Sequence, residues 1–360
     1  MALQDEFKKI LENTRKDEDA YVKMAVIGQP GAGKSTLINA LIGKKVAKTG
    51  PDTDNTTEAT PYEYHFQRII DLPGYATEKF SFETWKKKFC PEQYDMFLYV
   101  FRGKLLKEDN ALFTELGQWN TVRKRPLFLI RNFSADIESE EDKKAIISDV
   151  QKQMQSDSIP KIYFVDFRPP RMGLEELSED IRRTDFLSLL SERIQTAFQK
   201  KKEDYLQSCR KRASDEISTY KKMAAANGFN PIPGADVAAD IGIYFKMFSD
   251  IRAAYGISDD DLQGYIAIPV AKKLLELATR EGIMILLKNS VGKTLFKSIA
   301  RKIPIFGQGA SAAMGYKMAG YAGEDYDNKC CNLAKSVMDK LIDAEIRGFC
   351  AENAMRLQKC

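Results

Sequence analysis

Gly28-Gln29-Pro30-Gly31-Ala32-Gly33-Lys34-Ser35 is the stretch that decides the fold, because it fits the pattern G-x-x-x-x-G-K-[ST]. An apolar run, residues 21–27, precedes it and predicts a buried strand, and residues 35–42 follow as a predicted helix. In a strand–loop–helix unit of this kind the backbone N–H groups of the loop bind phosphate oxygens. The alternative, a chance glycine turn, would not require a strand before it and a helix after it.

Each part of this loop has a predicted task. The glycines allow the backbone to curl, Lys34 is predicted to bridge the β- and γ-phosphates, and Ser35 is predicted to give its hydroxyl to Mg²⁺. The N-terminal end of the following helix adds a positive potential. The residues predicted to contact the nucleotide here are Gly28, Gln29, Pro30, Gly31, Ala32, Gly33, Lys34, Ser35 and Thr36.

A second motif, Asp71-Leu72-Pro73-Gly74, follows a predicted strand over residues 68–72. An aspartate at a strand end can hold Mg²⁺ through a water molecule, and a glycine N–H can meet the γ-phosphate and sense its loss. Alone, this pattern is typical of ordinary turns. After a phosphate-binding loop it indicates a nucleotide switch, so Asp71 and Gly74 are predicted site residues.

A polar segment, residues 52–60, lies between the two motifs and contains Thr53, Thr56, Thr57 and Thr60. A loop here could place a threonine hydroxyl on Mg²⁺ when the γ-phosphate is present. We prefer Thr56, with Thr57 next, and the alternative is a solvated loop whose threonines bind nothing. The predicted metal ligands are therefore Ser35, Thr56 and Asp71, and the residues predicted to act in catalysis are Lys34, Thr56 and Gly74.

Predicted strands and helices alternate through the first half of the chain. The strands are residues 68–72, 96–101, 127–131 and 162–166, and the helices lie around residues 82–89, 107–122 and 138–155. This alternation predicts an α/β domain with a mostly parallel, doubly wound sheet. After about residue 184 only helical periodicity remains, with helices expected at residues 186–226, 237–255, 262–277, 311–322 and 329–357.

Composition narrows the function classes. The chain has 360 residues and a formal net charge of +4, a balance that argues against a dedicated nucleic-acid binder. The first residues show no signal-peptide pattern, and no uncharged apolar run is long enough to predict a membrane span. Six cysteines without a CxxC pair indicate a reduced, cytoplasmic setting, and acylation of those near the C-terminus stays open.

The two motifs and three further segments resemble the immunity-related (interferon-inducible) GTPases. The further segments are residues 56–62, residues 94–100 and residues 106–109, and a looser similarity continues over residues 244–262. Residues 230–236 and 303–308 are also similar to the helical tails of some bacterial Era-like GTPases.

The resemblance implies a Ras-like GTPase domain over residues 21–183 and an all-α helical domain over residues 184–360, onto which residues 1–20 pack as a helix. It further implies Mg²⁺ with bound GTP or GDP, self-association in the GTP state, and peripheral action at intracellular membranes in cell-autonomous defence.

One motif departs from the family pattern. The family reads guanine with T/N-K-x-D, whereas this chain has Asn132-Phe133-Ser134-Ala135-Asp136, which lacks the lysine and displaces the carboxylate by one position. A later loop reads Val165-Asp166-Phe167-Arg168. The predicted base contacts are Asn132, Asp136, Asp166 and Phe167. GTP is the favoured nucleotide, and relaxed base preference, including ATP, is the alternative.

Hydrolysis is expected to be slow. Tyr75 and Ala76 follow Gly74, so no glutamine is placed to orient the attacking water. Gln29, Arg102 and Lys104 are candidate contributors, and dimerisation is expected to raise the rate. A nucleotide-binding scaffold with negligible turnover remains the competing hypothesis.

Basic and apolar residues interleave over residues 272–302. This pattern suits a helix at a membrane interface. It equally suits a core helix whose lysines face the solvent.

Overall fold

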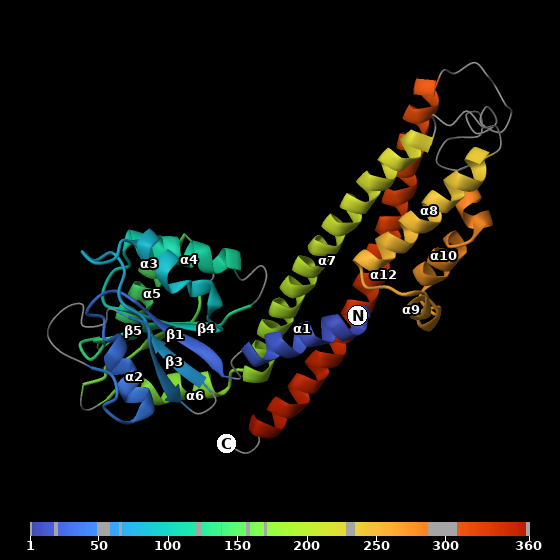
Figure 1. Cartoon of the computed structure of the whole chain (residues 1–360). Coiled ribbons are helices and arrows are strands. Elements are labelled where there is room, and N and C mark those ends of the chain that lie inside the picture. The colour runs from blue at the N-terminus through green and yellow to red at the C-terminus, as the bar shows by residue number, and fades with distance from the viewer. Residues whose placement is uncertain are drawn as a thin grey trace. The chain divides into compact units, whose positions relative to one another are not determined.

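The computed structural model describes residues 2–17, 21–48, 58–64, 67–119, 124–137, 139–155, 159–168, 171–227, 235–286 and 308–357. The chain divides into two compact units (Figure 1). One comprises Glu18–Ile194 with Gly348–Cys360, and the other comprises Met1–Asp17 with Gln195–Arg347. They are called the nucleotide unit and the helical unit below.

The nucleotide unit contains a six-stranded sheet with the order β2-β3-β1-β4-β5-β6. Its strands are parallel except for the antiparallel pair β2 and β3. The bounds are Val22–Gly28 for β1, Thr60–Tyr64 for β2, Gln67–Asp71 for β3, Met96–Phe101 for β4, Leu127–Arg131 for β5 and Ile162–Phe164 for β6. The expected α/β fold with a mostly parallel sheet is confirmed.

Helices cover both faces of this sheet. In Figure 1, α3 (Phe82–Phe89), α4 (Lys107–Trp119) and α5 (Glu140–Met154) lie on one face, and α2 (Lys34–Ile42) and α6 (Leu174–Arg182) lie on the other. A short 3₁₀ helix, η1 (Pro91–Gln93), precedes β4. The sequence interpretation missed α6 and the edge strand β2. The side chains of β2 are mostly half-exposed or exposed, so this strand carries no buried apolar pattern.

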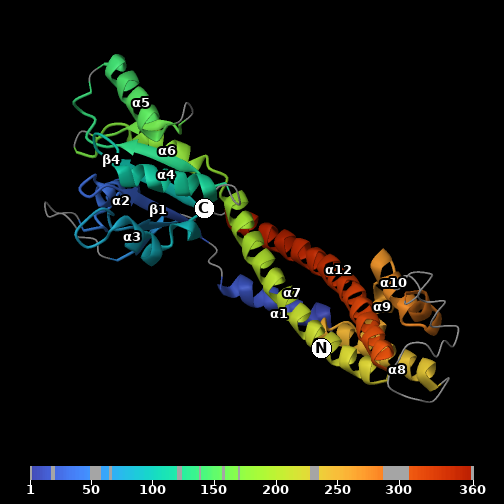
Figure 2. The same cartoon turned by 90° about the horizontal axis from the view of Figure 1, so that it is seen from above.

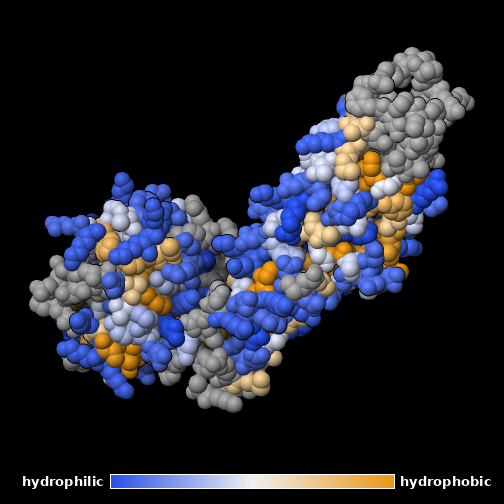
Figure 3. All heavy atoms as spheres, viewed as in Figure 1, coloured by the Kyte–Doolittle hydropathy of each residue, from blue (hydrophilic) through white to orange (hydrophobic). Residues whose placement is uncertain are grey.

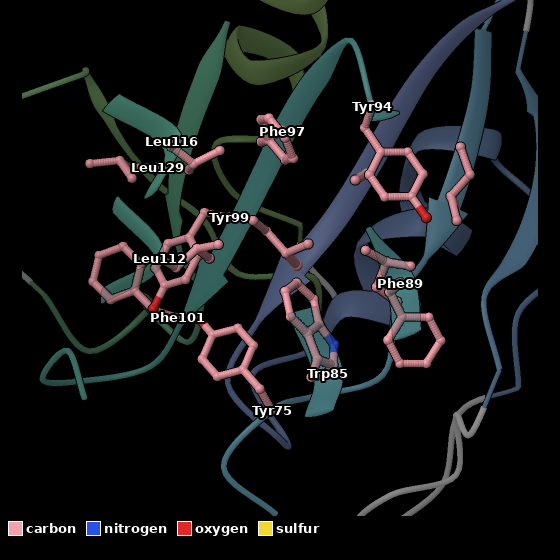
Figure 4. Packing of buried hydrophobic residues seen from close by; sticks show 14 of the residues in the cluster. Tyr75, Trp85, Phe89, Tyr94, Phe97, Tyr99, Phe101, Leu112, Leu116 and Leu129 are labelled. Carbon is pink, nitrogen blue, oxygen red and sulfur yellow. The ribbon is translucent and has the colours of Figure 1, made fainter. Parts of the chain in front are cut away.

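An aromatic core fills the space between the sheet and α3, α4 and α5 (Figure 4). Tyr75 and Trp85 are fully buried in it and meet edge to face, with ring centroids 5.1 Å apart. The indole N–H of Trp85 donates to the carbonyl oxygen of Pro73 over 2.7 Å. The segment that follows β3 is therefore held by the core of the domain.

The first residues of α7 (Phe186–Asn227) belong to the nucleotide unit and are tied to its sheet by a buried ion pair. Arg193 Nη1 lies 2.6 Å from Asp95 Oδ2 and donates to the carbonyl oxygen of Tyr21 over 3.0 Å. Asp95 also accepts from the backbone N–H of Lys23 over 2.7 Å. One carboxylate thus joins the starts of β1, β4 and α7.

The helical unit contains α1 (Leu3–Asp17), most of α7, α8 (Ala235–Ala254), α9 (Asp259–Gly264), α10 (Pro269–Leu277) and most of α12 (Gln308–Leu357). The N-terminal helix α1 packs into it, because Arg15 pairs with Glu345 over 2.9 Å and Tyr205 donates to Glu6 over 2.9 Å. Figure 2 shows α7 and α12 running side by side as the two long helices of this unit.

Two helix boundaries differ from the sequence expectation. The segments expected as separate helices at residues 311–322 and 329–357 form one helix, α12. Gly323 lies within this helix, and a Cβ there would lie 2.8 Å from the side chain of Ile217 on α7, so the glycine permits close helix packing. The single helix expected at residues 262–277 is divided into α9 and α10, since Pro269 begins a new helix.

Within the described part of residues 272–302, α10 has one buried apolar side and one exposed basic side. Ala271 and Leu274 on α10 are buried, while Lys272 and Lys273 are exposed. Within the described ranges, no helix combines the length and the apolar character needed to cross a membrane. Figure 3 shows that hydrophobic residues still gather at the surface over α8 and α10, and Phe245, Ile266 and Ile285 are exposed large apolar residues of this unit.

Candidate nucleotide-binding site

The loop between β1 and α2 has a backbone that only glycine permits at two positions. Gly28 has a φ of 132°, and a Cβ there would lie 2.0 Å from the carbonyl oxygen of Val100 on β4. Gly33 has a φ of 98°, and a Cβ there would lie 2.3 Å from Nδ2 of Asn132. The loop therefore curls tightly against the carboxyl ends of β4 and β5, where ligands bind in open α/β sheets.

Lys34 is buried at the start of α2 and turns back over the loop. Its Nζ donates to the carbonyl oxygens of Gly28 and Gln29 over 3.1 Å and 3.0 Å. The ammonium group thus lies beside the backbone that would surround a phosphate chain. The adjacent Thr36 is half-buried on α2, and Pro30 is half-buried in the loop.

Ser35 and Asp71, from the two motifs, meet directly. The hydroxyl of Ser35 donates to Oδ2 of Asp71 over 2.8 Å, and Asp71 is the last residue of β3, opposite Val26 of β1. A hydroxyl oxygen and a carboxylate oxygen are hard donors of the kind that Mg²⁺ prefers, and Mg²⁺ commonly takes its remaining ligands from water and substrate phosphates. The donor set therefore fits this ion.

The segment after β3 is fixed beside the phosphate loop. A Cβ on Gly74 would lie 3.0 Å from the ring of Pro30, so Gly74 stands directly against the loop. Tyr75 points into the core, and its hydroxyl donates to Oδ1 of Asp109 over 2.5 Å. The residue that follows Gly74 is thus part of the domain core and does not line the phosphate site.

Gln29 has its side-chain amide engaged in the interior. Its Nε2 donates to the carbonyl oxygen of Lys104 and to Oδ2 of Asp109, each over 2.8 Å. Arg102 instead lies over the ring of Phe133, with Cζ 4.7 Å from the ring centroid. Of the three side chains suggested as contributors to hydrolysis, Gln29 and Arg102 are therefore engaged in other contacts, whereas Lys104 is exposed.

Asn132 joins the loop after β5 to the phosphate loop. Its Nδ2 donates to the carbonyl oxygen of Ala32 over 2.8 Å, and its Oδ1 is buried without a hydrogen-bond partner among the described residues. Phe133 adopts the left-handed conformation with a φ of 57° and is flanked by Arg102 and Arg168. The sequence interpretation named Arg102 only as a candidate contributor to hydrolysis and did not predict that either arginine lies against Phe133.

The two predicted base-reading carboxylates have different surroundings. Asp166 is buried and accepts two hydrogen bonds from the guanidinium of Arg168, of 3.0 Å and 2.6 Å. The hydrogen bonds from Arg168 lower the pKa of Asp166 to about 2 despite desolvation. Asp136 is exposed, and Phe167 is buried close to Gly33. Asp136 is therefore the predicted carboxylate that solvent reaches directly.

Thr56, the preferred threonine, lies outside the described residues, as do Thr53 and Thr57. Thr60 begins β2, where its hydroxyl donates to the carbonyl oxygen of Glu58 over 3.4 Å. The third predicted metal ligand therefore stays a prediction. The structure brings together Lys34, Ser35, Asp71, Gly74 and Asn132 around one loop.

A family model described as a 50S ribosome-binding GTPase matches residues 23–133. Interferon-gamma-inducible GTPase 10 of Mus musculus is 25% identical over 266 residues, which cover 68% of this chain and 63% of the relative. GTPase Der of Buchnera aphidicola is 29% identical over 170 residues, which cover 44% of this chain and 36% of the relative. The chain thus spans less than two thirds of the length of these relatives.

Solved structures show weaker likenesses. Era of Aquifex aeolicus bound to GDP and AlF4⁻ has 21% identity and a TM-score of 0.36, covering 45% of this chain and 56% of that chain. An oligomerised bacterial dynamin pair, described as sensing and tethering membranes, has 13% identity and a TM-score of 0.37, covering 98% of this chain and 77% of that chain. Together, the sheet of this structure and the match over residues 23–133 show that a P-loop GTPase domain is present.

Proposed function

We propose that this chain binds Mg·GTP at residues 28–35, hydrolyses it slowly and acts as a nucleotide-dependent switch. One observation carries the proposal: the hydroxyl of Ser35 lies 2.8 Å from the carboxylate of Asp71, so the phosphate loop and the second motif meet at a site suited to Mg²⁺. A protein that senses a terminal phosphate needs its phosphate loop and its second motif to meet at one site in this way.

Each residue then has a task that its position supports. The loop amides and Lys34 bind the phosphates, and Ser35 with Asp71 would hold Mg²⁺, joined by Thr56. When bound, Mg²⁺ neutralises charge on the phosphate oxygens. Gly74 stands against Pro30 and offers its N–H to the terminal phosphate. Loss of that phosphate would remove the acceptor of the Gly74 N–H and release residues 52–60, which is the conformational basis of a switch.

Slow turnover follows from the buried state of Tyr75 and Gln29. Tyr75 donates to Asp109 in the core, and the amide of Gln29 donates to Lys104 and Asp109. Neither side chain is directed to orient an attacking water. A second copy of the chain would supply the missing group, so we include GTP-dependent self-association in the proposal.

Action at intracellular membranes is the remaining part of the proposal. It rests on the family resemblance and on relatives named interferon-inducible GTPases at 25% and 28% identity. The exposed apolar residues of the helical unit offer a surface for contact with a membrane or a protein. Co-sedimentation with anionic liposomes tests this part, and failure to pellet with either GDP or a GTP analogue would remove it.

A second candidate is a nucleotide-binding protein with relaxed base preference and negligible turnover. Asp166 is bound by Arg168, and no lysine stands after Asn132, so fewer groups are available to discriminate guanine from adenine. Under this candidate the nucleotide state would be read by a partner, without a hydrolytic cycle.

The first experiment identifies the nucleotide that co-purifies with the protein and compares GTP and ATP titrations. Binding of GTP only supports the first proposal, and equal binding supports the second. Lys34→Ala should abolish binding, whereas Lys44→Ala, an exposed lysine beyond the far end of α2, should retain it. Tight binding by Lys34→Ala would refute the site.

A second experiment measures phosphate release over a range of protein concentrations. Release that rises more than linearly with concentration supports hydrolysis in a self-associated state. Absence of release at every concentration, with GTP bound, would favour the scaffold.

A further inference from the structure

Asp109 is a fully buried carboxylate in the first turn of α4. It accepts hydrogen bonds from three different segments. Leu106 donates its backbone N–H over 2.5 Å, Gln29 donates its side-chain amide over 2.8 Å, and Tyr75 donates its hydroxyl over 2.5 Å. A buried carboxylate is stable only when such donors surround it.

One of these contacts has a local explanation. An acidic residue in the first turn of a helix satisfies a free backbone N–H and lies near the positive end of the helix dipole. The bond from Leu106 accounts for that task completely. The bonds from Gln29 and Tyr75 come from residues 80 and 34 positions away in sequence and need another explanation.

Both distant donors belong to the proposed triphosphate site. Gln29 is in the phosphate loop, and Tyr75 directly follows Gly74, which itself stands against Pro30. Tyr75 is also fixed by Trp85 and Phe82, whose rings it meets at 5.1 Å and 5.6 Å between centroids. Burial and the nearby charge of Asp109 hold the pKa of Tyr75 well above its ordinary value, which further favours the neutral hydroxyl that donates to Asp109.

We infer that Asp109 is a positioning residue that couples the phosphate loop to Gly74 through Gln29 and Tyr75. It fixes the separation of these two segments before a ligand arrives, so that the Gly74 N–H is already placed for a terminal phosphate. The inference rests on the proposed function, and it assigns to Asp109 a part in discriminating nucleoside triphosphate from diphosphate.

The test is Tyr75→Phe, which removes one hydroxyl and leaves the ring in the core. Tyr163→Phe is the matched control, since the Tyr163 hydroxyl donates to Asp180 over 2.8 Å in the same unit and touches neither motif. Affinities for fluorescent GDP and for fluorescent guanosine 5′-(β,γ-imido)triphosphate are measured with Mg²⁺ for each protein.

Tyr75→Phe should lose about fivefold or more in affinity for the triphosphate analogue relative to GDP. Tyr163→Phe should keep the wild-type ratio. An equal fall in both affinities would show general loosening of the fold and would overturn the inference. A wild-type protein that binds neither nucleotide would refute the proposed function, and with it this inference, whereas an unchanged ratio in Tyr75→Phe would refute the inference alone.

A double variant checks that Asp109 is the link. If Gln29→Met and Tyr75→Phe both act by breaking one chain of contacts, the double variant should change the affinity ratio no more than the larger single change. Effects that multiply would show that the two residues act separately and would overturn the role assigned to Asp109.

Discussion

The side-chain amide of Asn132 donates a 2.8 Å hydrogen bond to the carbonyl oxygen of Ala32, so the loop after β5 holds the phosphate loop in place. A Cβ built on Gly33 would lie only 2.3 Å from the same Nδ2 atom, which is too close for any side chain at that position. One asparagine therefore holds the loop and leaves no room for a side chain at residue 33, whose φ of 98° separately favours glycine.

Replacing Asn132 by alanine should weaken nucleotide binding. The change removes the bond to Ala32 and leaves a carbonyl oxygen without that partner, which costs about 1–3 kcal/mol. The affinity for GDP should fall by about tenfold, measured by fluorescence titration. Asn328→Ala, at an exposed position of α12 in the helical unit, should leave the affinity unchanged. Equal affinities for all three proteins would contradict this role of Asn132.

Gly33→Ala should abolish nucleotide binding, because the new Cβ combines a φ of 98° with overlap of the Asn132 amide. Gly43 is the comparison, since it has a φ of 75° and no atom within 4 Å of a built Cβ. Gly43→Ala should cost about 1 kcal/mol of stability and retain binding. Calorimetric titration and thermal unfolding measure the two quantities, and binding by folded Gly33→Ala at wild-type strength would disprove the steric argument.

The phosphate loop could be predicted because its chemistry is local. Residues 28–35 contain their own strand, turn and helix signals, and Ser35 and Asp71 then meet because the parallel strands β1 and β3 are adjacent. The alternation of strands and helices likewise predicts the sheet.

Contacts set by tertiary packing could not be predicted in this way. Tyr75 follows a motif that faces the nucleotide, yet its side chain enters the core, where Asp109 accepts its hydroxyl. The pairing of Asp166 with Arg168 is close in sequence, but only the loop geometry turns the guanidinium back onto the carboxylate. The close contact of Gly323 on α12 with Ile217 on α7 is likewise set by packing between residues far apart in the sequence.

Removal of Mg²⁺ should weaken GTP binding more than GDP binding in the wild type. Ser35→Ala should reproduce much of that loss in the presence of Mg²⁺, because it deletes a proposed ligand that lies beside Asp71. We expect the Mg²⁺ concentration needed for half-maximal GTP binding to rise by about tenfold or more. Ser188→Ala, exposed at the start of α7, is the control. An unchanged Mg²⁺ requirement in Ser35→Ala would exclude the hydroxyl as a ligand.

Acid should destabilise the loop that contains Asp166. Hydrogen bonds from Arg168 lower the pKa of Asp166 from 3.8 to about 2. A carboxylate whose folded-state pKa is depressed contributes stability above its unfolded pKa and loses that contribution as pH falls through the folded value. The contribution should therefore be complete above pH 3.8 and fade toward about pH 2.

Arg168→Ala tests this pH dependence directly. The pKa of Asp166 should return toward 3.8, so the difference in unfolding temperature between wild type and variant should shrink as pH falls from 3.8 to about 2. Thermal unfolding followed by circular dichroism gives this difference. A difference that stays constant across that interval would show that the ion pair does not set the acid response.

The buried pair of Arg193 and Asp95 should contribute strongly to the stability of the nucleotide unit. Arg193→Met removes the guanidinium that pairs with the buried Asp95 carboxylate and leaves the bond from the Lys23 N–H in place. Breaking a buried pair by removing one partner costs about 3–5 kcal/mol. Adding Asp95→Asn removes the buried negative charge while keeping an acceptor for the Lys23 N–H, so the double variant should regain most of the stability. Lys143→Met, at an exposed pair with Glu140, should change little. Denaturant unfolding of the four proteins measures their free energies of unfolding. A double variant less stable than Arg193→Met would show that the stability lost in Arg193→Met arises from packing around the arginine stem and not from the charge of Asp95.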